Sequence, residues 1–161
     1  PVVERAIDPI GRPMGPFELI DLVGWKVAAH VQDTMVGAFP DRFYASENLH
    51  ALAEIDAPLD KNRHGKVTDL SKAARKRIRV GKRAAAPEEI LHRVEDELAR
   101  EISIMLDEGV VAAAEDIDLC LILGAGFPFQ AGGATPYLDR VGATRRVRDA
   151  DFHEPRIAGA R

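Results

Sequence analysis

The sequence is poor in the features that mark several large classes of protein. Cys120 is its single cysteine among 161 residues, so the chain cannot close an internal disulfide. No apolar run approaches the ~20 residues that a membrane-spanning helix needs, and the N-terminus carries no basic and apolar secretion leader. We therefore expect a cytoplasmic protein in which Cys120, inside the apolar string IDLCLILG, is a small buried hydrophobic residue.

Motifs for metals, cofactors and nucleophiles are also scarce. The five histidines lie far apart without paired ligand spacing, and there is neither a His-Glu-x-x-His motif nor a Walker-type loop. The string GAGFPF at 124–129 lacks the third glycine of a dinucleotide fingerprint and follows a predicted helix instead of a strand. No nucleophile elbow is present, although sequence alone leaves a Ser–His–Asp arrangement open. The sequence thus predicts no catalytic, cofactor-binding or metal-binding residue in this chain.

What the sequence does contain is apolar residues at helical spacing, without sustained period-2 alternation. The clearest helix begins at Pro87 and runs to about Glu108, with one apolar stripe and acidic residues towards its first half. Residues 114–123 are nearly all apolar and predict a deeply buried helix. Shorter helices are expected at 2–10, 17–23, 25–38, 47–55, 70–77 and 136–141. The prediction is an all-α fold whose tail, from residue 144, is loosely attached.

Residues 60–83 differ from the rest of the chain in charge. They hold ten lysines and arginines against two acidic residues, whereas the whole chain has a net charge of −4. We interpret this segment as an exposed linker that balances an otherwise acidic chain. Contact with the phosphates of a nucleotide-like ligand is the alternative. The segment lacks interleaved aromatic residues, so stacking on nucleic-acid bases is not expected.

A glycine- and proline-containing motif occurs twice. Residues 11–24 read GRPMGPFELIDLVG, and residues 126–142 read GFPFQAGGATPYLDRVG. The motifs begin in register at an offset of 115 and end in register at an offset of 118, because the second turn carries a three-residue insertion. Apolar positions upstream of both motifs align as well. The sequence therefore predicts two copies of one helix–turn–helix unit.

Each Gly/Pro turn has two interpretations. In the structural one, glycine and proline shape a corner between helices while Met14, Phe127 and Phe129 fill the core beneath it. In the functional one, the corner presents backbone and apolar side chains to an apolar ligand. The sequence leaves both open.

The first motif, followed by an apolar helix, resembles the C-terminal domain of 3-hydroxyacyl-CoA dehydrogenases. The second, within DEGVVAAAEDIDLCLILGAGFPFQAGGATPYLDRVG, is similar to the second copy of that domain in multifunctional fatty-acid oxidation enzymes. The resemblance implies two tandem helical units of this type, with a fold like the C-terminal domain of 6-phosphogluconate dehydrogenase. We accordingly expect a first unit at 1–58, a basic linker at 59–86, a second unit at 87–143 and the tail at 144–161.

The resemblance also implies where the chemistry lies. In that family a Rossmann domain upstream holds NAD and the catalytic His–Glu pair, and a further active-site Asn opens the first helical copy in an Asn-Arg pair. Asn62-Arg63 lies in the linker and does not match that place. Pro1 begins inside a helical pattern and is not methionine, so we expect a fragment of a longer protein. Because the resemblance places the catalytic residues upstream of this segment, we expect the fragment to be catalytically silent by itself.

For the longer protein, the resemblance implies oxidation of a 3-hydroxyacyl-CoA with NAD in β-oxidation. By motif match, the acyl side of the substrate cleft lies nearest Pro13, Met14, Gly15 and Pro16, and the second copy packs on the first as a structural mimic. The implied partners are the acyl-CoA substrate, the protein's own Rossmann domain, and a second subunit or β-oxidation complex. No membrane or nucleic-acid partner is expected. The alternative is a non-catalytic α-helical dimerisation or assembly module.

Overall fold

A computed structural model describes residues 2–81 and 83–154 of the chain. Its internal contacts divide the chain into two compact units. Residues 14–84 form one, which we call the hairpin unit. Residues 2–13 join residues 85–154 to form the other, which we call the long-helix unit. Each unit is described by itself.

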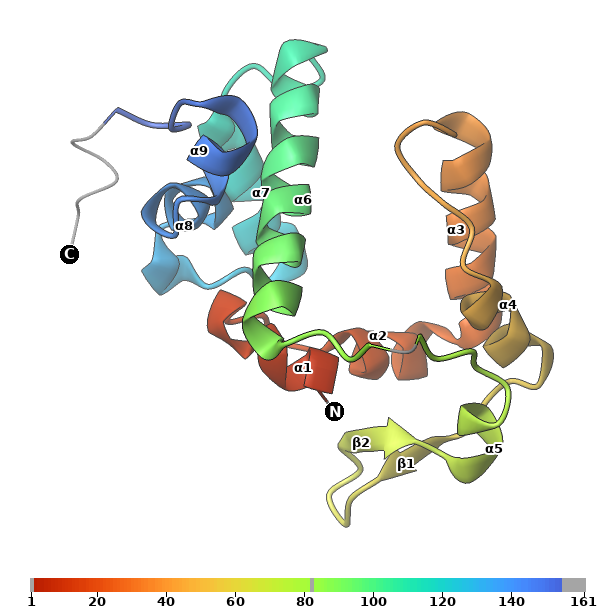
Figure 1. The fold of residues 1–161 in the computed structure, drawn as a ribbon. Coiled ribbons are helices and arrows are strands. Elements are labelled where there is room, and N and C mark those ends of the chain that lie inside the picture. Colours follow the sequence, from red (N-terminus) through yellow and green to blue (C-terminus); the bar gives the residue numbers. More distant parts are fainter. Residues whose placement is uncertain (1, 82, 155–161) are drawn as a thin grey trace. The chain divides into compact units, whose positions relative to one another are not determined.

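The hairpin unit contains helices, an antiparallel β-hairpin and a short helical turn (Figure 1). In chain order these elements are α2 (Pro16–Val23), α3 (Trp25–Ala38), α4 (Glu47–Glu54), β1 (Leu59–Lys61), β2 (Val67–Leu70) and α5 (Lys72–Arg75). The core of the unit gathers around Trp25, against which the ring of Phe17 packs, and its other buried side chains are small or aliphatic. Its buried members are Trp25, Ala29, Leu52, Ala53, Ala57 and Ala74.

Local sequence explains where α2 and α3 begin and end. Pro16 occupies the first position of α2, where the missing N–H costs no helical hydrogen bond. Gly24 separates the two helices with a positive φ of 87°, a conformation that favours glycine. Trp25 then begins α3, and its indole N–H donates to the Ala57 carbonyl at 2.6 Å. That bond ties α3 to the segment that follows α4.

The hairpin corrects the all-α prediction. Leu59 pairs with Leu70 across the two strands, and both residues pack against the core of the unit. The strands are three and four residues long and carry charged side chains, so they are too short to show a period-2 pattern. Apart from this hairpin the fold is helix-rich, as expected. The boundaries at 58, 86 and 143 between family-type units stay predictions.

Acidic side chains of the hairpin unit neutralise part of the basic segment. The ammonium group of Lys61 lies 2.7 Å from the carboxylate of Asp21, and the guanidinium of Arg79 lies 2.7 Å from that of Glu47. Such exposed pairs contribute only about 0–1 kcal/mol each. They agree with the charge-balancing part of the linker interpretation. The expectation of an exposed linker is wrong for residues 59–75, which form the β-hairpin and α5 and place Ala74 in the core of the unit. The phosphate-binding alternative stays a prediction.

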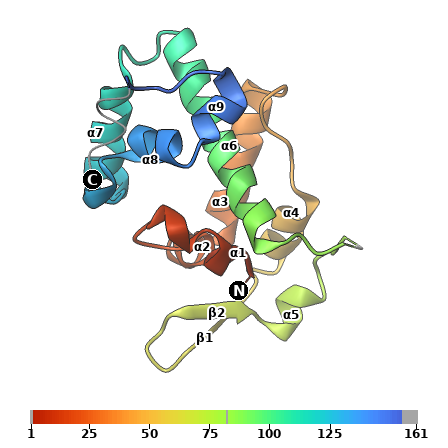
Figure 2. The ribbon, with the colours of Figure 1, turned by 60° about the vertical axis from the view of Figure 1, so that its left-hand side comes forward.

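The long-helix unit is built around one helix of 21 residues. Its elements are α1 (Val2–Ala6), η1 (Asp8–Ile10), α6 (Pro87–Asp107), α7 (Ala114–Ala125), η2 (Phe129–Ala131), α8 (Ala134–Arg140) and α9 (Ala143–Arg148). Helix α6 packs against α9 and α1, and α7 packs against α8 (Figures 1 and 2). One apolar cluster, around Ile102 and Leu138, lies between α6, α7, α8 and α9; another gathers Ile7, Ile10 and Phe127.

The start of the predicted tail is part of this unit. Ala143 and Thr144 of α9 are fully buried, and the backbone N–H groups of Phe152 and His153 both donate to the Asp139 carboxylate. The expectation of a loosely attached tail is therefore wrong for residues 144–154. Helix α9 is too short, and its buried residues are too small, to produce a visible apolar period. Residues 155–161 lie outside the described part of the chain.

None of the helices in residues 2–81 and 83–154 combines the length and the apolar character that crossing a bilayer requires.

A buried carboxylate anchors α8 to α6. Glu95 of α6 is 2% exposed, and the phenol of Tyr137 donates to its Oε1 at 2.6 Å. The guanidinium of Arg146 lies 3.5 Å from its other oxygen. Burial, and then the hydrogen bond to a carboxylate, raise the pKa of Tyr137 above its ordinary value, because both disfavour the phenolate. The pair therefore holds its proton while the fold is intact.

Tyr137 is expected to ionise only as the unit unfolds. In a Tyr44→Phe variant Tyr137 is the sole tyrosine, so phenolate absorbance reports on it alone. The raised pKa contributes stability that is fully present below the unfolded value of about 10 and is lost as pH rises beyond it. Phenolate absorbance and loss of helical circular dichroism should then coincide in an alkaline titration. Phenolate formation near pH 10 with unchanged circular dichroism would contradict this assignment.

Candidate functional site

The two Gly/Pro turns begin with the same backbone conformation. Gly11 ends η1 with φ 75° and ψ 25°, and Gly126 ends α7 with φ 68° and ψ 29°. Both values lie in the left-handed region, which glycine adopts without the penalty that a Cβ brings. The turns therefore share a local geometry as well as a sequence pattern, although two tandem domains stay a prediction.

Within the long-helix unit each turn places its proline against the glycine of the other. A methyl group on Gly11 would lie 2.7 Å from Cγ of Pro128, and one on Gly126 would lie 3.1 Å from Cγ of Pro13. We call this arrangement the reciprocal Gly–Pro contact. Two features favour glycine at each of these positions. One is the positive φ, and the other is the close approach of the proline ring.

The structural interpretation of the turns is correct for some of their residues and wrong for others. Phe127 is buried in the cluster that holds Ile7 and Ile10. Phe129, by contrast, is 79% exposed and Met14 is 37% exposed, so neither fills the core beneath its turn as that interpretation required. Apolar side chains on the surface of a turn leave the ligand-binding interpretation in place for these two.

The division between the two units falls inside the predicted substrate-binding turn. Pro13 belongs to the long-helix unit and lies against Gly126, whereas Met14 begins the hairpin unit. Gly15 precedes α2 in an extended conformation, and its N–H donates to the carboxylate of Glu18 at 3.0 Å. Pro16, the fourth predicted residue, is the first residue of α2. The assignment of these four residues to substrate binding stays a prediction.

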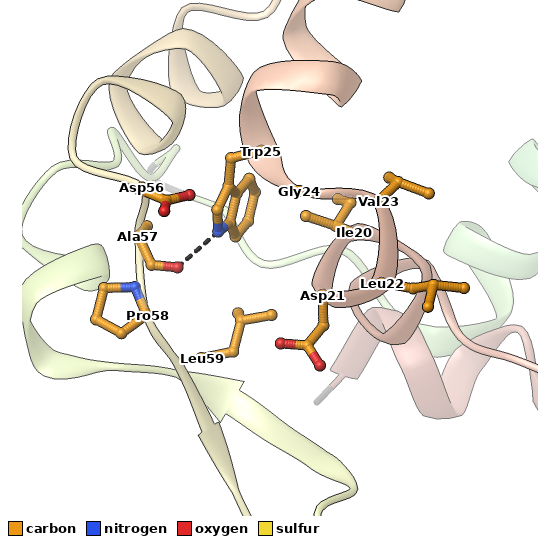
Figure 3. A pocket seen from close by; sticks show the side chains of 10 residues that line it. All are labelled: Ile20, Asp21, Leu22, Val23, Gly24, Trp25, Asp56, Ala57, Pro58 and Leu59. Atoms are coloured by element: carbon orange, nitrogen blue, oxygen red, sulfur yellow. Dashed lines mark hydrogen bonds between the residues drawn. The ribbon is translucent and has the colours of Figure 1, made fainter.

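A pocket that the sequence did not indicate lies in the hairpin unit, with a volume of about 360 Å³ (Figure 3). It is lined by the end of α2, the start of α3 and residues 56–59. Its ionisable groups are the carboxylates of Asp21 and Asp56, and the polar atom of Trp25 is already bonded to a carbonyl. Asp21 is paired with Lys61, and no lysine or arginine is among the lining residues, so the pocket offers no cation to the phosphates of CoA or NAD.

A hydroxyl, an imidazole and a carboxylate meet in the long-helix unit, where sequence had left such an arrangement open. Thr135 Oγ1 donates to Asp118 Oδ2 at 2.6 Å and lies 2.7 Å from His153 Nε2. The carboxylate of Asp118 thus bonds the hydroxyl. On the far side of the imidazole, Oε1 of Glu115 lies 3.7 Å from His153 Nδ1, which is too long for the hydrogen bond by which a catalytic triad orients its histidine. Thr135 is also 0% exposed, so no substrate reaches it. The cluster is an anchor that holds residues 149–154 on α7 and α8.

The glycine-rich string at 124–129 does not fit NAD. Gly126 terminates helix α7, whereas a dinucleotide-binding turn runs from a strand into the N-terminus of a helix, where the pyrophosphate binds. The strands of the described residues form an antiparallel hairpin, without the parallel crossover of such a site. Among those residues no three His, Cys, Asp or Glu side chains are placed to hold a metal ion.

The first Gly/Pro turn lies in a segment that matches a known protein family. Residues 2–68 match the family model of the 3-hydroxyacyl-CoA dehydrogenase C-terminal domain. The matched segment runs from α1 through the first Gly/Pro turn and α2–α4 into β2. It confirms the resemblance that the first motif carries and implies oxidoreductase parentage. The second Gly/Pro turn lies beyond the match, so its relation to the same family stays a prediction.

Alanine at Gly11 is expected to cost more stability than alanine at Gly109. Both glycines have a positive φ, but nothing lies within 4 Å of a methyl group on Gly109. Gly109→Ala should therefore cost only the left-handed penalty, about 1–2 kcal/mol. Gly11→Ala should add about 1–3 kcal/mol, because the ring of Pro128 has to move. Urea unfolding of both variants measures the difference, and equal costs would show that the reciprocal Gly–Pro contact carries no strain.

The hydroxyl of Thr135 is expected to matter more than its methyl group. Thr135→Val keeps the shape but leaves the carboxylate of Asp118 and the imidazole of His153 without their shared partner. We expect a loss of about 2–3 kcal/mol in the free energy of unfolding, while Thr135→Ser, which keeps the hydroxyl, loses less than about 1 kcal/mol. Thermal and urea unfolding compare the two. If the valine variant is as stable as the serine variant, the hydroxyl of Thr135 does not anchor this cluster.

Proposed function

We propose that this chain supplies the substrate-side helical domain of an NAD-dependent 3-hydroxyacyl-CoA dehydrogenase of fatty-acid β-oxidation. The main observation that supports this proposal is the family match over residues 2–68, which includes the predicted substrate-binding turn. In this proposal a Rossmann domain outside the present sequence binds NAD and holds the catalytic His–Glu pair. The longer protein then oxidises a 3-hydroxyacyl-CoA to the 3-ketoacyl-CoA.

The surface of α2 and α3 supports this proposal. Leu19 and Leu22, three residues apart on α2, and Val27 on α3 are each at least half exposed. Met14, immediately before α2, is a flexible and polarizable side chain of the kind that adapts to irregular apolar ligands. An acyl chain, or the apolar wall of a second domain, has the chemistry to cover such a surface.

The proposed contribution of this chain to the reaction is binding and exclusion of water. The turn holds no acid, base or nucleophile: its members are two prolines, a glycine and a methionine. Its rigidity suits a wall, because each proline fixes its own φ and the Gly15 N–H is already bonded to Glu18. An apolar wall raises the specificity for acyl substrates without taking part in bond making.

Substitutions at Met14 in the full-length protein test the proposal. Met14→Asp places a charge where the acyl chain would lie, and burying an unpaired carboxylate beside an apolar chain is costly. We expect kcat/KM for a 3-hydroxyacyl-CoA to fall at least about tenfold, equivalent to about 1.4 kcal/mol of transition-state binding. Met14→Leu, of similar volume, should stay within a few-fold of the wild type.

The outcome also separates the proposal from the alternative of a non-catalytic assembly module. Turnover that is equal in the wild type, Met14→Asp and Met14→Leu would remove the turn from the substrate cleft. If the wild-type protein binds no acyl-CoA in equilibrium titration and shows no dehydrogenase activity, the assembly module is the better description.

A further inference from the structure

Positive charge is concentrated in the hairpin unit. Residues 14–84 hold twelve lysines and arginines against nine acidic residues, whereas the rest of the chain holds ten against seventeen. The same unit contains Met14, Gly15 and Pro16 of the predicted substrate-binding turn. A positive surface attracts a substrate that carries several phosphates. The pocket of the unit has no lysine or arginine in its lining, so any phosphate bound by this unit has to meet its cations outside the pocket.

The turn between β1 and β2 is stabilised by hydrogen bonds of its own. The side-chain oxygen of Asn62 accepts the backbone N–H groups of His64 at 2.9 Å and Lys66 at 3.1 Å. The backbone N–H of Asn62 in turn donates to the Lys66 carbonyl at 2.9 Å. Arg63 and Lys66 are exposed in this turn, and we call these two residues the basic tip. Because the backbone that carries them is already ordered, less entropy is lost when they bind a ligand.

The cations of the basic tip are available to an anion from outside the unit. In the part of the chain that the structure describes, no carboxylate pairs with Arg63. The ammonium group of Lys66 lies 3.9 Å from the carboxylate of Glu18, and the lysine side chain is 70% exposed, so this pair contributes little stability. An arginine binds phosphate through two parallel N–H bonds, and a lysine adds a point charge. The basic tip therefore has the groups that recognise phosphate.

Glu18 places the basic tip beside the predicted substrate-binding turn. One oxygen of its carboxylate accepts the N–H of Gly15 at 3.0 Å, and the other lies 3.9 Å from the ammonium group of Lys66. Helix α2, which begins at Pro16, packs against β2, and Figures 1 and 2 show the hairpin beneath this helix. An apolar turn and a cationic tip are therefore neighbours within one unit.

We propose that the basic tip binds the phosphate groups of the CoA part of the substrate. The proposal rests on the proposed function, which makes a 3-hydroxyacyl-CoA the substrate of the longer protein. The pantetheine arm separates the phosphates of CoA from the acyl chain, so the unit offers an apolar region to the chain and a cationic region to its carrier. Because the carrier is the same for every chain length, the basic tip adds affinity for CoA thioesters without selecting among them.

Two double variants with the same change in charge test the proposal in the full-length protein. Arg63→Glu with Lys66→Glu reverses the basic tip. Lys72→Glu with Lys76→Glu is the matched control, because it reverses two exposed cations at the ends of α5. In equilibrium titration with CoA, the dissociation constant should rise at least about tenfold in the first variant and less than about twofold in the control. A wild type that binds no CoA overturns the proposal, and so does an equal loss in both variants.

A substrate without phosphates gives a second readout. A 3-hydroxyacyl thioester of pantetheine keeps the acyl chain and the reacting atoms but carries no phosphate. Reversal of the basic tip should lower kcat/KM at least about tenfold for the 3-hydroxyacyl-CoA, mainly through KM, and leave it unchanged for the pantetheine thioester. Equal losses for the two substrates would overturn the proposal. If the wild type turns over neither substrate, the proposed function fails, whereas the CoA titration still decides whether the basic tip binds phosphate.

Discussion

The close approach of two proline rings to two glycine backbones is the constraint on which the long-helix unit depends. It joins residues 11–13 to residues 126–128, which are more than a hundred positions apart in the chain. With that contact in place, Ile7 and Ile10 come to lie in the apolar cluster of Phe127. The contact explains why residues 2–13 pack with the C-terminal half of the chain while Met14 and its successors pack elsewhere. Both glycines have a positive φ, and a side chain at Gly11 would in addition force the ring of Pro128 to move, since its Cβ would lie 2.7 Å from that ring.

Two carboxylates buried in the same unit, those of Glu95 and Asp118, are satisfied by specific partners. Glu95 accepts the phenol of Tyr137, and Asp118 accepts both the N–H and the hydroxyl of Thr135. A buried carboxylate without such partners would cost several kcal/mol, so these bonds fix the positions of α6, α7 and α8 relative to one another inside the unit. They also explain why a hydroxyl next to an imidazole serves as an anchor here and not as a nucleophile.

The sequence was sufficient to predict the helices with strong periodicity and clear end signals. The expected helix at 25–38 coincides with α3, and Pro87 begins α6 as expected. The β-hairpin was missed because strands of three and four residues have no room for a recognisable alternation. Helix α9 was missed because its buried face consists of Ala143 and Thr144, which carry little apolar signal. The composition of α7 predicted a deeply buried helix and a buried Cys120, but Leu119, Cys120 and Leu123 are exposed, so both predictions are wrong for that side of the helix.

The candidate site was only partly predictable, because its contacts join residues that are far apart in the sequence. The glycines and prolines of both turns stand out in the sequence, yet nothing there shows that each proline lies on the glycine of the other turn. The acidic pocket combines α2 and α3 with residues 56–59, a proximity that only the fold creates. The resemblance of the first motif to 3-hydroxyacyl-CoA dehydrogenases was predictable because the turn itself carries it, and the match over residues 2–68 confirms it.

Hydrogen–deuterium exchange of the full-length protein, with and without a 3-hydroxyacyl-CoA, tests most directly whether the first Gly/Pro turn faces the substrate. The turn offers the backbone amides of Met14 and Gly15, since its other two residues are prolines. We predict that the ligand slows exchange at these two amides and leaves Gly65, at the tip of the β-hairpin, unchanged. Saturating ligand that slows exchange elsewhere but not at Met14 and Gly15 would contradict the substrate-side assignment.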